Sequence, residues 1–161
     1  MRWLLSQLLG NFGIVHKRTL YRSAQRWIIL WFVIPWLAKH RNLKTVINLA
    51  VSKKDKQDAY ERKVCAKHGL KLIEYPSIAP PPWKGEGTNV WDAIEALMDS
   101  LHRGAVLVHC EGGTDRTFGV VGWYMKTVME WPNHLIEETY NIYGKPGWNW
   151  VWWFYNGFPK E

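Results

Sequence analysis

The sequence is poor in cysteine, with two residues in a chain of 161, Cys65 and Cys110. Two thiols cannot form the disulfide framework of a small secreted domain, and with six scattered histidines they give no zinc-site spacing. No apolar run reaches the roughly 18 residues of a membrane span, because the longest, residues 27–38, is short and contains Pro35. No signal-peptide cleavage pattern follows the N-terminus. We therefore expect a cytoplasmic protein with reduced thiols and no bound metal.

Acidic residues are scarce in the first half of the chain. Residues 1–73 contain 15 lysines and arginines against three acidic residues, whereas residues 74–161 contain six against eleven. The net charge is +12 in the first part and −5 in the second, which gives +7 overall. This separation is typical of a protein with an anion-facing side, but it also fits two parts of one globule that attract each other. The sequence leaves both interpretations open.

Strand and helix patterns alternate along most of the chain. Apolar β-branched runs predict strands, an apolar stripe at helical spacing marks residues 89–101, and a proline- and glycine-rich loop spans residues 76–88. Alternation of this kind predicts an α/β fold, with a mostly parallel central sheet flanked by helices. The predicted elements are strand 44–49, helix 52–68 with Ser52 as its cap, strand 70–75, helix 89–101, strand 105–109 and helices 117–130, 132–143 and 148–155.

The segment richest in reactive groups lies where strand 105–109 meets the following helix. Gly112 and Gly113 allow a sharp turn that brings successive backbone N–H groups and the positive end of the helix dipole to one point. Such a turn binds anions and favours the thiolate over the thiol, so we expect Cys110 to be an anionic nucleophile.

Three neighbours of Cys110 complete this segment. Arg116 carries a planar set of donors suited to two phosphoryl oxygens. Thr117 can donate its hydroxyl to the sulfur and help it leave. We expect His109 to organise the loop and the thiolate through its ring N–H groups.

The pattern His109-Cys110-x5-Arg116-Thr117 resembles the signature of the cysteine-dependent protein tyrosine phosphatases, His-Cys-x5-Arg-Ser/Thr. Residues 11–25 look like the opening of the compact dual-specificity phosphatases, and residues 44–49 look like one of their strands. The low-molecular-weight phosphatases do not fit, since their cysteine loop lies near the N-terminus. The resemblance covers about residues 11–145 and implies a dual-specificity-phosphatase-like fold in a single domain, residues 1–161, with residues 146–161 as a Trp-rich extension.

The resemblance implies hydrolysis of a phosphomonoester in two steps through a phosphocysteine, without a cofactor. Cys110 would be the nucleophile, and Arg116 and the loop would stabilise the phosphoryl group. The loop residues expected to bind the substrate are Glu111, Gly112, Gly113 and Thr114. Glu111 also fits a simpler role as a solvated loop residue.

The general acid is where the sequence departs from the family, which usually takes it from an Asp on a loop upstream of the cysteine. Residues 77–83 contain no Asp. Asp115 is the first candidate, because relatives with an Asp-Arg-Thr loop, such as the myotubularins, are thought to use that position; orientation of Arg116 or of the loop backbone is nearly as good an interpretation. Glu86 is the alternative acid, and Asp92 fits better as a helix-start residue.

A phosphoprotein, of tyrosine or dual specificity, is the favoured substrate. Inositol phosphates or phosphoinositides are the alternative, supported by the basic first half and opposed by the lack of lysine between Cys110 and Arg116. An RNA 5′-triphosphatase is a weaker third reading, and other nucleic-acid partners are not expected. A catalytically silent phosphate-binding module is disfavoured, because binding alone needs no nucleophile.

Tryptophan is abundant, with 12 residues that crowd into two segments. We interpret these segments as helices that pack their aromatic side chains on each other and on the core, as helices that are apolar all round usually do. Weak docking on a membrane surface or a protein is the alternative. Cys65 is interpreted as a packing residue. The crowded residues are Trp27, Trp31 and Trp36, then Trp148, Trp150, Trp152 and Trp153.

Overall fold

Five strands form the central sheet, in the order β1-β2-β7-β3-β4. The computed structural model describes residues 9–51, 55–76, 78–79, 88–144 and 146–156. Strand β1 pairs with β2 in antiparallel fashion, and all other neighbours in this sheet are parallel. The strands are β1 (Gly13–His16), β2 (Leu20–Ala24), β3 (Leu43–Asn48), β4 (Lys71–Glu74) and β7 (Ala105–Cys110).

Strand β7 occupies the middle of the sheet, and all six of its residues are buried. Successive side chains of a strand point to opposite faces. Val106 and Val108 accordingly belong to one core cluster, and Ala105 and Leu107 belong to another on the opposite face. The continuously apolar run thus marks a central parallel strand, as the sequence predicted.

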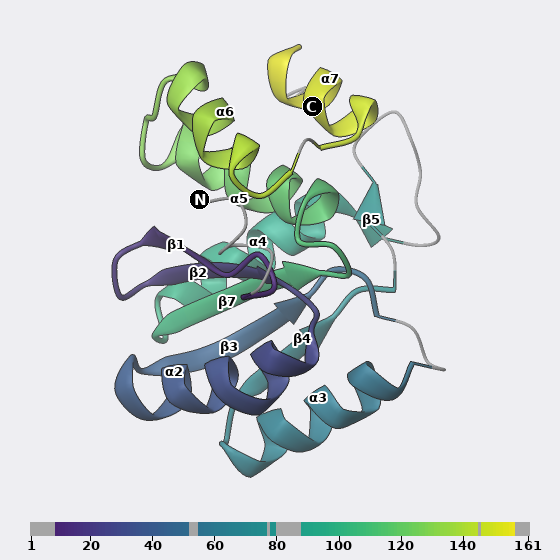
Figure 1. Ribbon diagram of the computed structural model, residues 1–161. Helices are drawn as coiled ribbons and strands as arrows, with labels where there is room; N and C mark the ends of the chain where they lie inside the picture. Colours follow the sequence, from purple (N-terminus) through teal and green to yellow (C-terminus); the bar gives the residue numbers. More distant parts are fainter. Residues whose placement is uncertain (1–8, 52–54, 77, 80–87, 145, 157–161) are drawn as a thin grey trace.

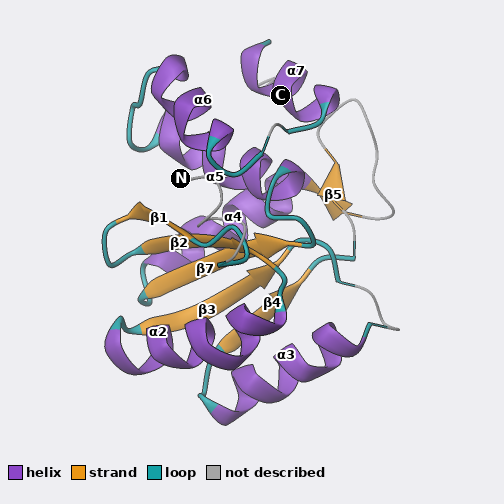
Figure 2. Cartoon of the chain, in the orientation of Figure 1, coloured by secondary structure: helices purple, strands orange, loops and turns teal. Residues whose placement is uncertain are grey.

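Helices cover both faces of the sheet, as Figures 1 and 2 show. One face carries η1, a π-helical segment (Ile29–Val33), with α2 (Ile34–His40) and α3 (Lys56–Lys67). The other face carries α4 (Val90–Leu101) and α5 (Asp115–Thr127), and α6 (Asn133–Asn141) and α7 (Trp148–Tyr155) pack on α5. The predicted fold class, an α/β protein with a mostly parallel sheet, is therefore confirmed.

Several predicted helix boundaries differ from the observed ones, most clearly in α3 and α5. Helix α3 begins at Lys56 rather than at residue 52, because Asp55 is its N-cap and accepts a hydrogen bond from the Gln57 backbone N–H at 2.6 Å. Ser52, the predicted cap, lies outside the described residues. Helix α5 begins at Asp115, two residues before the predicted start, and ends at Thr127, three residues before the predicted end.

The loop predicted at residues 76–88 is flanked by a small second sheet. Strands β5 (Ile78–Ala79) and β6 (Thr88–Asn89) pair in parallel, and residues 80–87 between them lie outside the described residues. Glu86, the alternative general acid, belongs to that segment. The two-residue strands were not predicted, since so short a run carries no periodic signal.

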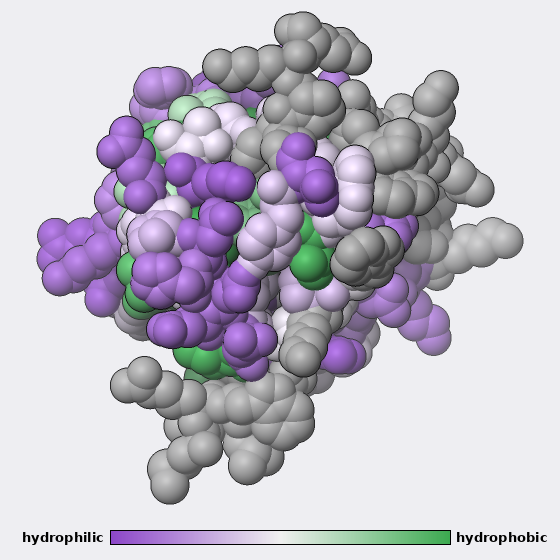
Figure 3. Space-filling view, turned by 90° about the horizontal axis from the view of Figure 1, so that it is seen from above, coloured by the Kyte–Doolittle hydropathy of each residue, from purple (hydrophilic) through white to green (hydrophobic). Residues whose placement is uncertain are grey.

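The two Trp-rich segments differ in burial. In α7, Trp150 and Trp153 are buried in the core, which confirms the predicted packing there. In η1 and α2 the prediction is wrong: Trp31 and Trp36 are exposed, because Ile29, Leu30, Ile34 and Leu37 occupy the inward positions. Among the described residues, no helix has both the length and the hydropathy that a membrane crossing requires. The face over α6 and α7 lies on the other side of the sheet from η1 and α2 (Figure 1). It is largely hydrophilic where the structure describes it (Figure 3).

Candidate active site

Cys110 is the last residue of β7, at the carboxyl edge of the parallel strands. Its side chain is buried on the face that carries α4 and α5. The Thr117 hydroxyl, which is also buried, donates a hydrogen bond to the Cys110 sulfur at 3.1 Å. A donor held at this distance stabilises a thiolate more than a neutral thiol. The hydrogen bond that the sequence predicted for Thr117 is therefore present, and its catalytic role stays a prediction.

The loop between Cys110 and α5 folds against the end of β2. Gly113 has a φ of 67°, in the left-handed region. A Cβ atom there would lie 2.6 Å from the backbone nitrogen of Ala24 and 2.7 Å from the carbonyl oxygen of Ser23, so glycine is required. Gly112 is less constrained, since its Cβ would meet nothing closer than the Thr114 hydroxyl at 3.4 Å. The expectation of tight backbone approach is thus met at Gly113 and not at Gly112.

Arg22 of β2 holds this loop from within the protein. Its fully buried guanidinium donates a hydrogen bond to the Gly113 carbonyl, and its Cζ lies 3.9 Å from the ring centroid of Tyr143 and 4.8 Å from that of Tyr140. The Asn11 side-chain amide adds a hydrogen bond to the Gly112 carbonyl at 2.8 Å. Sequence reasoning assigned no role to these residues, because neither belongs to the cysteine motif.

The N-terminus of α5 faces the same loop. Thr114 is the N-cap residue and makes no capping side-chain hydrogen bond. The first backbone N–H groups of a helix have no partner within the helix, and they carry the positive end of its dipole. Arg116, the second residue of α5, is half-buried, and within the described ranges its guanidinium has no protein partner. Helix N-termini of this kind bind anions, so these groups are the candidate donors for an anionic substrate.

His109 does not act as the sequence predicted. Because it alternates with Cys110 along β7, its ring points to the opposite face of the sheet, toward α3. There its Nε2 lies 2.7 Å from Oε1 of Glu61, and both side chains are buried. Its backbone carbonyl accepts a hydrogen bond from Leu49. His109 therefore anchors the strand that carries the cysteine and does not contact the sulfur through its ring.

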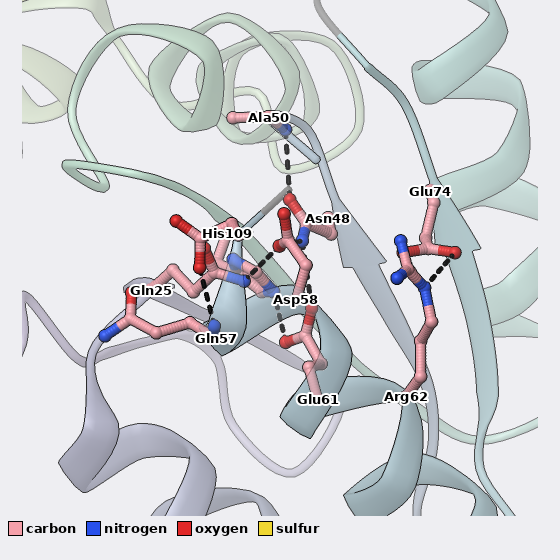
Figure 4. A network of polar contacts seen from close by, with 10 residues as sticks. Gln25, Asn48, Ala50, Gln57, Asp58, Glu61, Arg62, Glu74 and His109 are labelled. Carbon is pink, nitrogen blue, oxygen red and sulfur yellow. Dashed lines mark hydrogen bonds and ion pairs between the residues drawn. The ribbon is translucent and has the colours of Figure 1, made fainter. Parts of the chain in front are cut away.

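Glu61 belongs to a buried polar network between α3 and the sheet, shown in Figure 4. The Asn48 amide donates to Asp58 and to Glu61 at 2.9 Å each, and the Gln25 amide donates to Asp58 at 2.5 Å. Sequence reasoning missed this network, because charged residues in a helix ordinarily indicate its solvent face. Side-chain amides thus donate hydrogen bonds to both carboxylates. In the described part of the chain, no cluster of three or more His, Cys, Asp or Glu residues could hold a metal ion.

The candidate acids lie in different surroundings. Asp115, the first residue of α5, is half-buried and accepts a hydrogen bond from the backbone N–H of Gly147, just before α7. Its carboxylate thus joins the loop after Cys110 to the C-terminal segment rather than to Arg116. Asp92 is exposed in the first turn of α4, as expected of a helix-start residue. Glu111 is exposed within the loop.

Cys65 is buried like Cys110, but on the opposite face of the sheet. It lies in α3 and packs in the cluster on the lower face of the sheet in Figure 1, with 1% of its surface exposed. Burial, followed by the charges of Glu61 and Glu74, raises the pKa of the Cys65 thiol from 9.0 to about 12. The prediction that Cys65 is a packing residue is consistent with this environment, since a neutral buried thiol is unreactive.

Comparisons with known proteins bear on the fold. No family model and no curated protein matches the sequence. Among solved structures, TpbA of P. aeruginosa bound to phosphotyrosine has a TM-score of 0.60 at 23% identity, over 80% of this chain and 72% of that one. The catalytic core of the PP-IP phosphatase Siw14 of S. cerevisiae has a TM-score of 0.61 at 19% identity, over 83% and 75%.

A further match, PTPMT1, has a TM-score of 0.53 at 15% identity, over 81% of this chain and 79% of that one. All three neighbours are cysteine-dependent phosphatases of the tyrosine and dual-specificity superfamily. At these identities the likeness establishes the fold. The resemblance that the His-Cys-x5-Arg-Thr pattern suggested is therefore confirmed at the level of the fold.

Proposed function

We propose that this chain is a cysteine-dependent phosphatase acting on phosphomonoesters, and that its favoured substrate is a phosphoprotein of tyrosine or dual specificity. The observation that carries the proposal is the 3.1 Å hydrogen bond from the Thr117 hydroxyl to the Cys110 sulfur, at the N-terminus of α5. A module that only bound phosphate would need neither the thiol nor this hydroxyl. The whole chain, residues 1–161, is proposed to act as one domain, since α7 packs on α5.

In the first step the Cys110 thiolate attacks phosphorus, and the bond between phosphorus and the ester oxygen breaks as the sulfur–phosphorus bond forms. Negative charge spreads over the three remaining phosphoryl oxygens. These oxygens accept hydrogen bonds from the loop N–H groups and from the Arg116 guanidinium. Gly113 and Arg22 hold the loop in the shape that aims those donors. The leaving oxygen takes a proton from a general acid.

In the second step water attacks phosphorus, the sulfur–phosphorus bond breaks and inorganic phosphate leaves. The thiolate that re-forms accepts the hydrogen bond of the Thr117 hydroxyl, which makes the sulfur a better leaving group. The proton lost by the water returns to the group that served as the acid. No electron transfer is involved, so the cycle closes without a cofactor.

We propose Asp115 as that acid. It is part of the loop, and the hydrogen bond from Gly147 occupies its Oδ1, which leaves Oδ2 for the leaving group. Glu86 is the alternative, and it lies outside the described residues. Asp115→Asn should slow hydrolysis of an alkyl phosphate by about 100-fold and that of a nitrophenyl phosphate far less, because a good leaving group needs little protonation. An equal loss of rate for both esters would show that the general acid is another residue.

An inositol phosphate is the second candidate substrate. It is favoured by the basic first half of the chain and by the likeness to Siw14, a PP-IP phosphatase. Opposed to it are the exposed Glu111 and the lack of lysine or arginine between Cys110 and Arg116, since a highly charged inositol ring needs additional cations. TpbA bound to phosphotyrosine supports the phosphoprotein alternative.

The proposal is tested by the turnover of four substrates in the presence of a chelator. We expect hydrolysis of a phosphotyrosine peptide above that of a phosphoserine peptide, an inositol phosphate and an RNA 5′-triphosphate. Cys110→Ser should abolish it, and Arg116→Lys should lower it by about 100-fold or more, because lysine cannot contact two phosphoryl oxygens in one plane. Full activity of Cys110→Ser would refute the mechanism. Faster hydrolysis of the inositol phosphate than of the phosphotyrosine peptide would change only the proposed substrate class.

A further inference from the structure

The helical segment of η1 and α2 is apolar on both sides. Ile29, Leu30, Ile34 and Leu37 point inward and are fully buried. The outer side carries Phe32 at 66% exposure, Trp31 at 52% and Trp36 at 46%. A helix that is apolar all round is normally covered on both sides. Here the described residues cover one side only.

Two further aromatic residues extend this outer side. Trp27 is 38% exposed, and its ring centroid lies 5.4 Å from that of Trp31 and 5.6 Å from that of Tyr60 on α3. Together these five residues form what we name the aromatic surface: Trp27, Trp31, Phe32, Trp36 and Tyr60. It spans two neighbouring helices on one face of the sheet, where α2 and α3 lie in Figure 1. Large exposed aromatic side chains gathered on one side of a protein are typical of an interaction site.

The charge beside the aromatic surface is positive. Residues 1–54 contain no Asp or Glu and ten lysines and arginines. Arg26 precedes the surface, and Lys39 and Arg41 follow it, all exposed. The Arg41 guanidinium lies 4.7 Å from the centroid of the Trp36 ring, so cation and aromatic ring share one location. On the neighbouring α3, the acidic residues Asp58 and Glu61 are buried in the network of Figure 4.

The opposite side of the molecule is acidic. Helix α6 lies at the other face of the sheet from α2 (Figure 1) and exposes Glu137 and Glu138, with Glu130 exposed just before it. The aromatic surface and its basic neighbours thus lie on one side of the sheet, and these exposed acidic residues lie on the other. This arrangement favours one orientation of the protein at an anionic surface, with α2 toward it.

We propose that the aromatic surface docks on an anionic phospholipid membrane. Tryptophan rings suit the headgroup level, Phe32 reaches the acyl boundary, and Arg26, Lys39 and Arg41 pair with lipid phosphates. A second copy of the chain would bring two positive rims together, which disfavours a homodimer at this surface. An acidic protein partner would also satisfy the charge, and the polyglutamate arm of the experiment below separates it from a membrane.

The aromatic surface begins beside the candidate active site. Trp27 lies two residues after Gln25, whose backbone N–H donates to the Cys110 carbonyl at 2.8 Å. Tyr60 directly precedes Glu61, the partner of His109. Docking would therefore hold the membrane against the face of the sheet opposite to the one that carries the Cys110 side chain.

Co-sedimentation with phosphatidylcholine vesicles, with and without phosphatidylserine, tests the proposal directly. We expect the full-length protein to bind the anionic vesicles and to be released by added salt. The double variant Trp31→Ser/Phe32→Ser should lose this binding. Lys39→Glu/Arg41→Glu should weaken it by about 30-fold or more, since each basic residue near such a surface contributes about fivefold.

Trp152→Ser, on the exposed side of α7, is the matched control and should bind like the wild type. All variants should hydrolyse a soluble nitrophenyl phosphate at the wild-type rate, which shows that they are folded and separates this test from that of the proposed function. Equal binding to neutral vesicles, or full binding by Trp31→Ser/Phe32→Ser, would overturn the proposal. So would dimerisation that Phe32→Ser abolishes, or binding to a polyglutamate peptide without binding to vesicles.

Discussion

Oε1 of Glu61 lies 2.7 Å from Nε2 of His109, and each of these side chains is about 1% exposed. This contact joins α3 to the residue that directly precedes the candidate nucleophile. The backbone carbonyl of His109 is also bonded to Leu49, after β3. Strand β7 is thus held from the face opposite to the one that carries the Cys110 side chain.

Removal of Glu61 should destabilise the protein strongly. Glu61→Ala leaves the buried His109 ring without its partner and removes one of the two acceptors of the Asn48 amide, which costs about 3 kcal/mol in the free energy of unfolding. Glu74→Ala is the matched control, because its pair with Arg62 is exposed and is worth at most about 1 kcal/mol. Denaturant unfolding of both variants measures the difference. Equal losses would contradict a structural role for the buried pair.

The contact between α5 and α7 should be sensitive to a single methyl group. A Cβ atom at Gly119 would overlap the Trp150 ring, so Gly119→Ala should lower the free energy of unfolding by about 2 kcal/mol. Gly122→Ala, three residues along the same helix, meets nothing closer than a Phe118 ring atom at 3.4 Å and should be neutral or slightly stabilising. Thermal unfolding measures the stability of the two variants against that of the wild type. A tolerated Gly119→Ala would mean that α7 does not pack on α5 in solution.

The sequence predicted the fold class and the order of most elements, because strands and helices leave periodic apolar patterns. It also identified the loop from Cys110 to Thr117, whose chemistry is contiguous. It could not reveal Arg22 or Glu61, since their roles depend on contacts between elements far apart in the chain. The same reason explains His109: alternation along a buried strand turns its ring away from the neighbouring cysteine.

The prediction for the first Trp-rich segment failed for a different reason. The apolar composition of a helix predicts that the helix is covered, but it does not show which of its sides the rest of the chain covers. Aliphatic residues take the inward positions of η1 and α2, and Trp31 and Trp36 are left outside. In α7, by contrast, Trp153 and Phe154 are buried in the core.

Thr117→Val should slow the second step of the proposed reaction. Valine keeps the shape of the side chain but removes the hydroxyl that donates to the Cys110 sulfur. A hydrogen bond to a charged group is worth about 1.5–3 kcal/mol, so hydrolysis of the phosphocysteine should slow by about 10- to 100-fold. Stopped-flow measurement with nitrophenyl phosphate should show a burst of nitrophenol followed by slow turnover. Thr127→Val, at the exposed end of α5, should behave like the wild type.

Ionisation of Cys65 should destabilise the fold at alkaline pH. Burial raises the pKa of this thiol from 9.0 to about 12, so between these values the folded protein keeps a proton that the unfolded chain has lost. The free energy of unfolding should therefore fall as pH rises through this window, by up to about 1.4 kcal/mol per pH unit from this group. Cys65→Ala should show a shallower decline. Identical slopes for wild type and variant would contradict the prediction.

Alkylation should distinguish the two cysteines at neutral pH. Both cysteines are buried, but the raised pKa of Cys65 keeps its thiol neutral, whereas the proposed mechanism uses Cys110 as a nucleophile; iodoacetamide should therefore modify Cys110 and spare Cys65. Inorganic phosphate should protect Cys110, because it occupies the same donors as a substrate. Peptide mass spectrometry identifies the modified residue. Faster labelling of Cys65, or labelling of Cys110 that phosphate does not affect, would be inconsistent with the proposed site.

Capture of the intermediate tests the central claim most directly. Thr117→Val protein is mixed with nitrophenyl phosphate, quenched in acid within the burst, and digested for mass spectrometry. The account predicts one added PO₃H unit on the peptide that contains Cys110, and none in the variant that also carries Cys110→Ser. Phosphate on another residue, or turnover that leaves Cys110 unmodified throughout, would show that the sulfur is not the nucleophile.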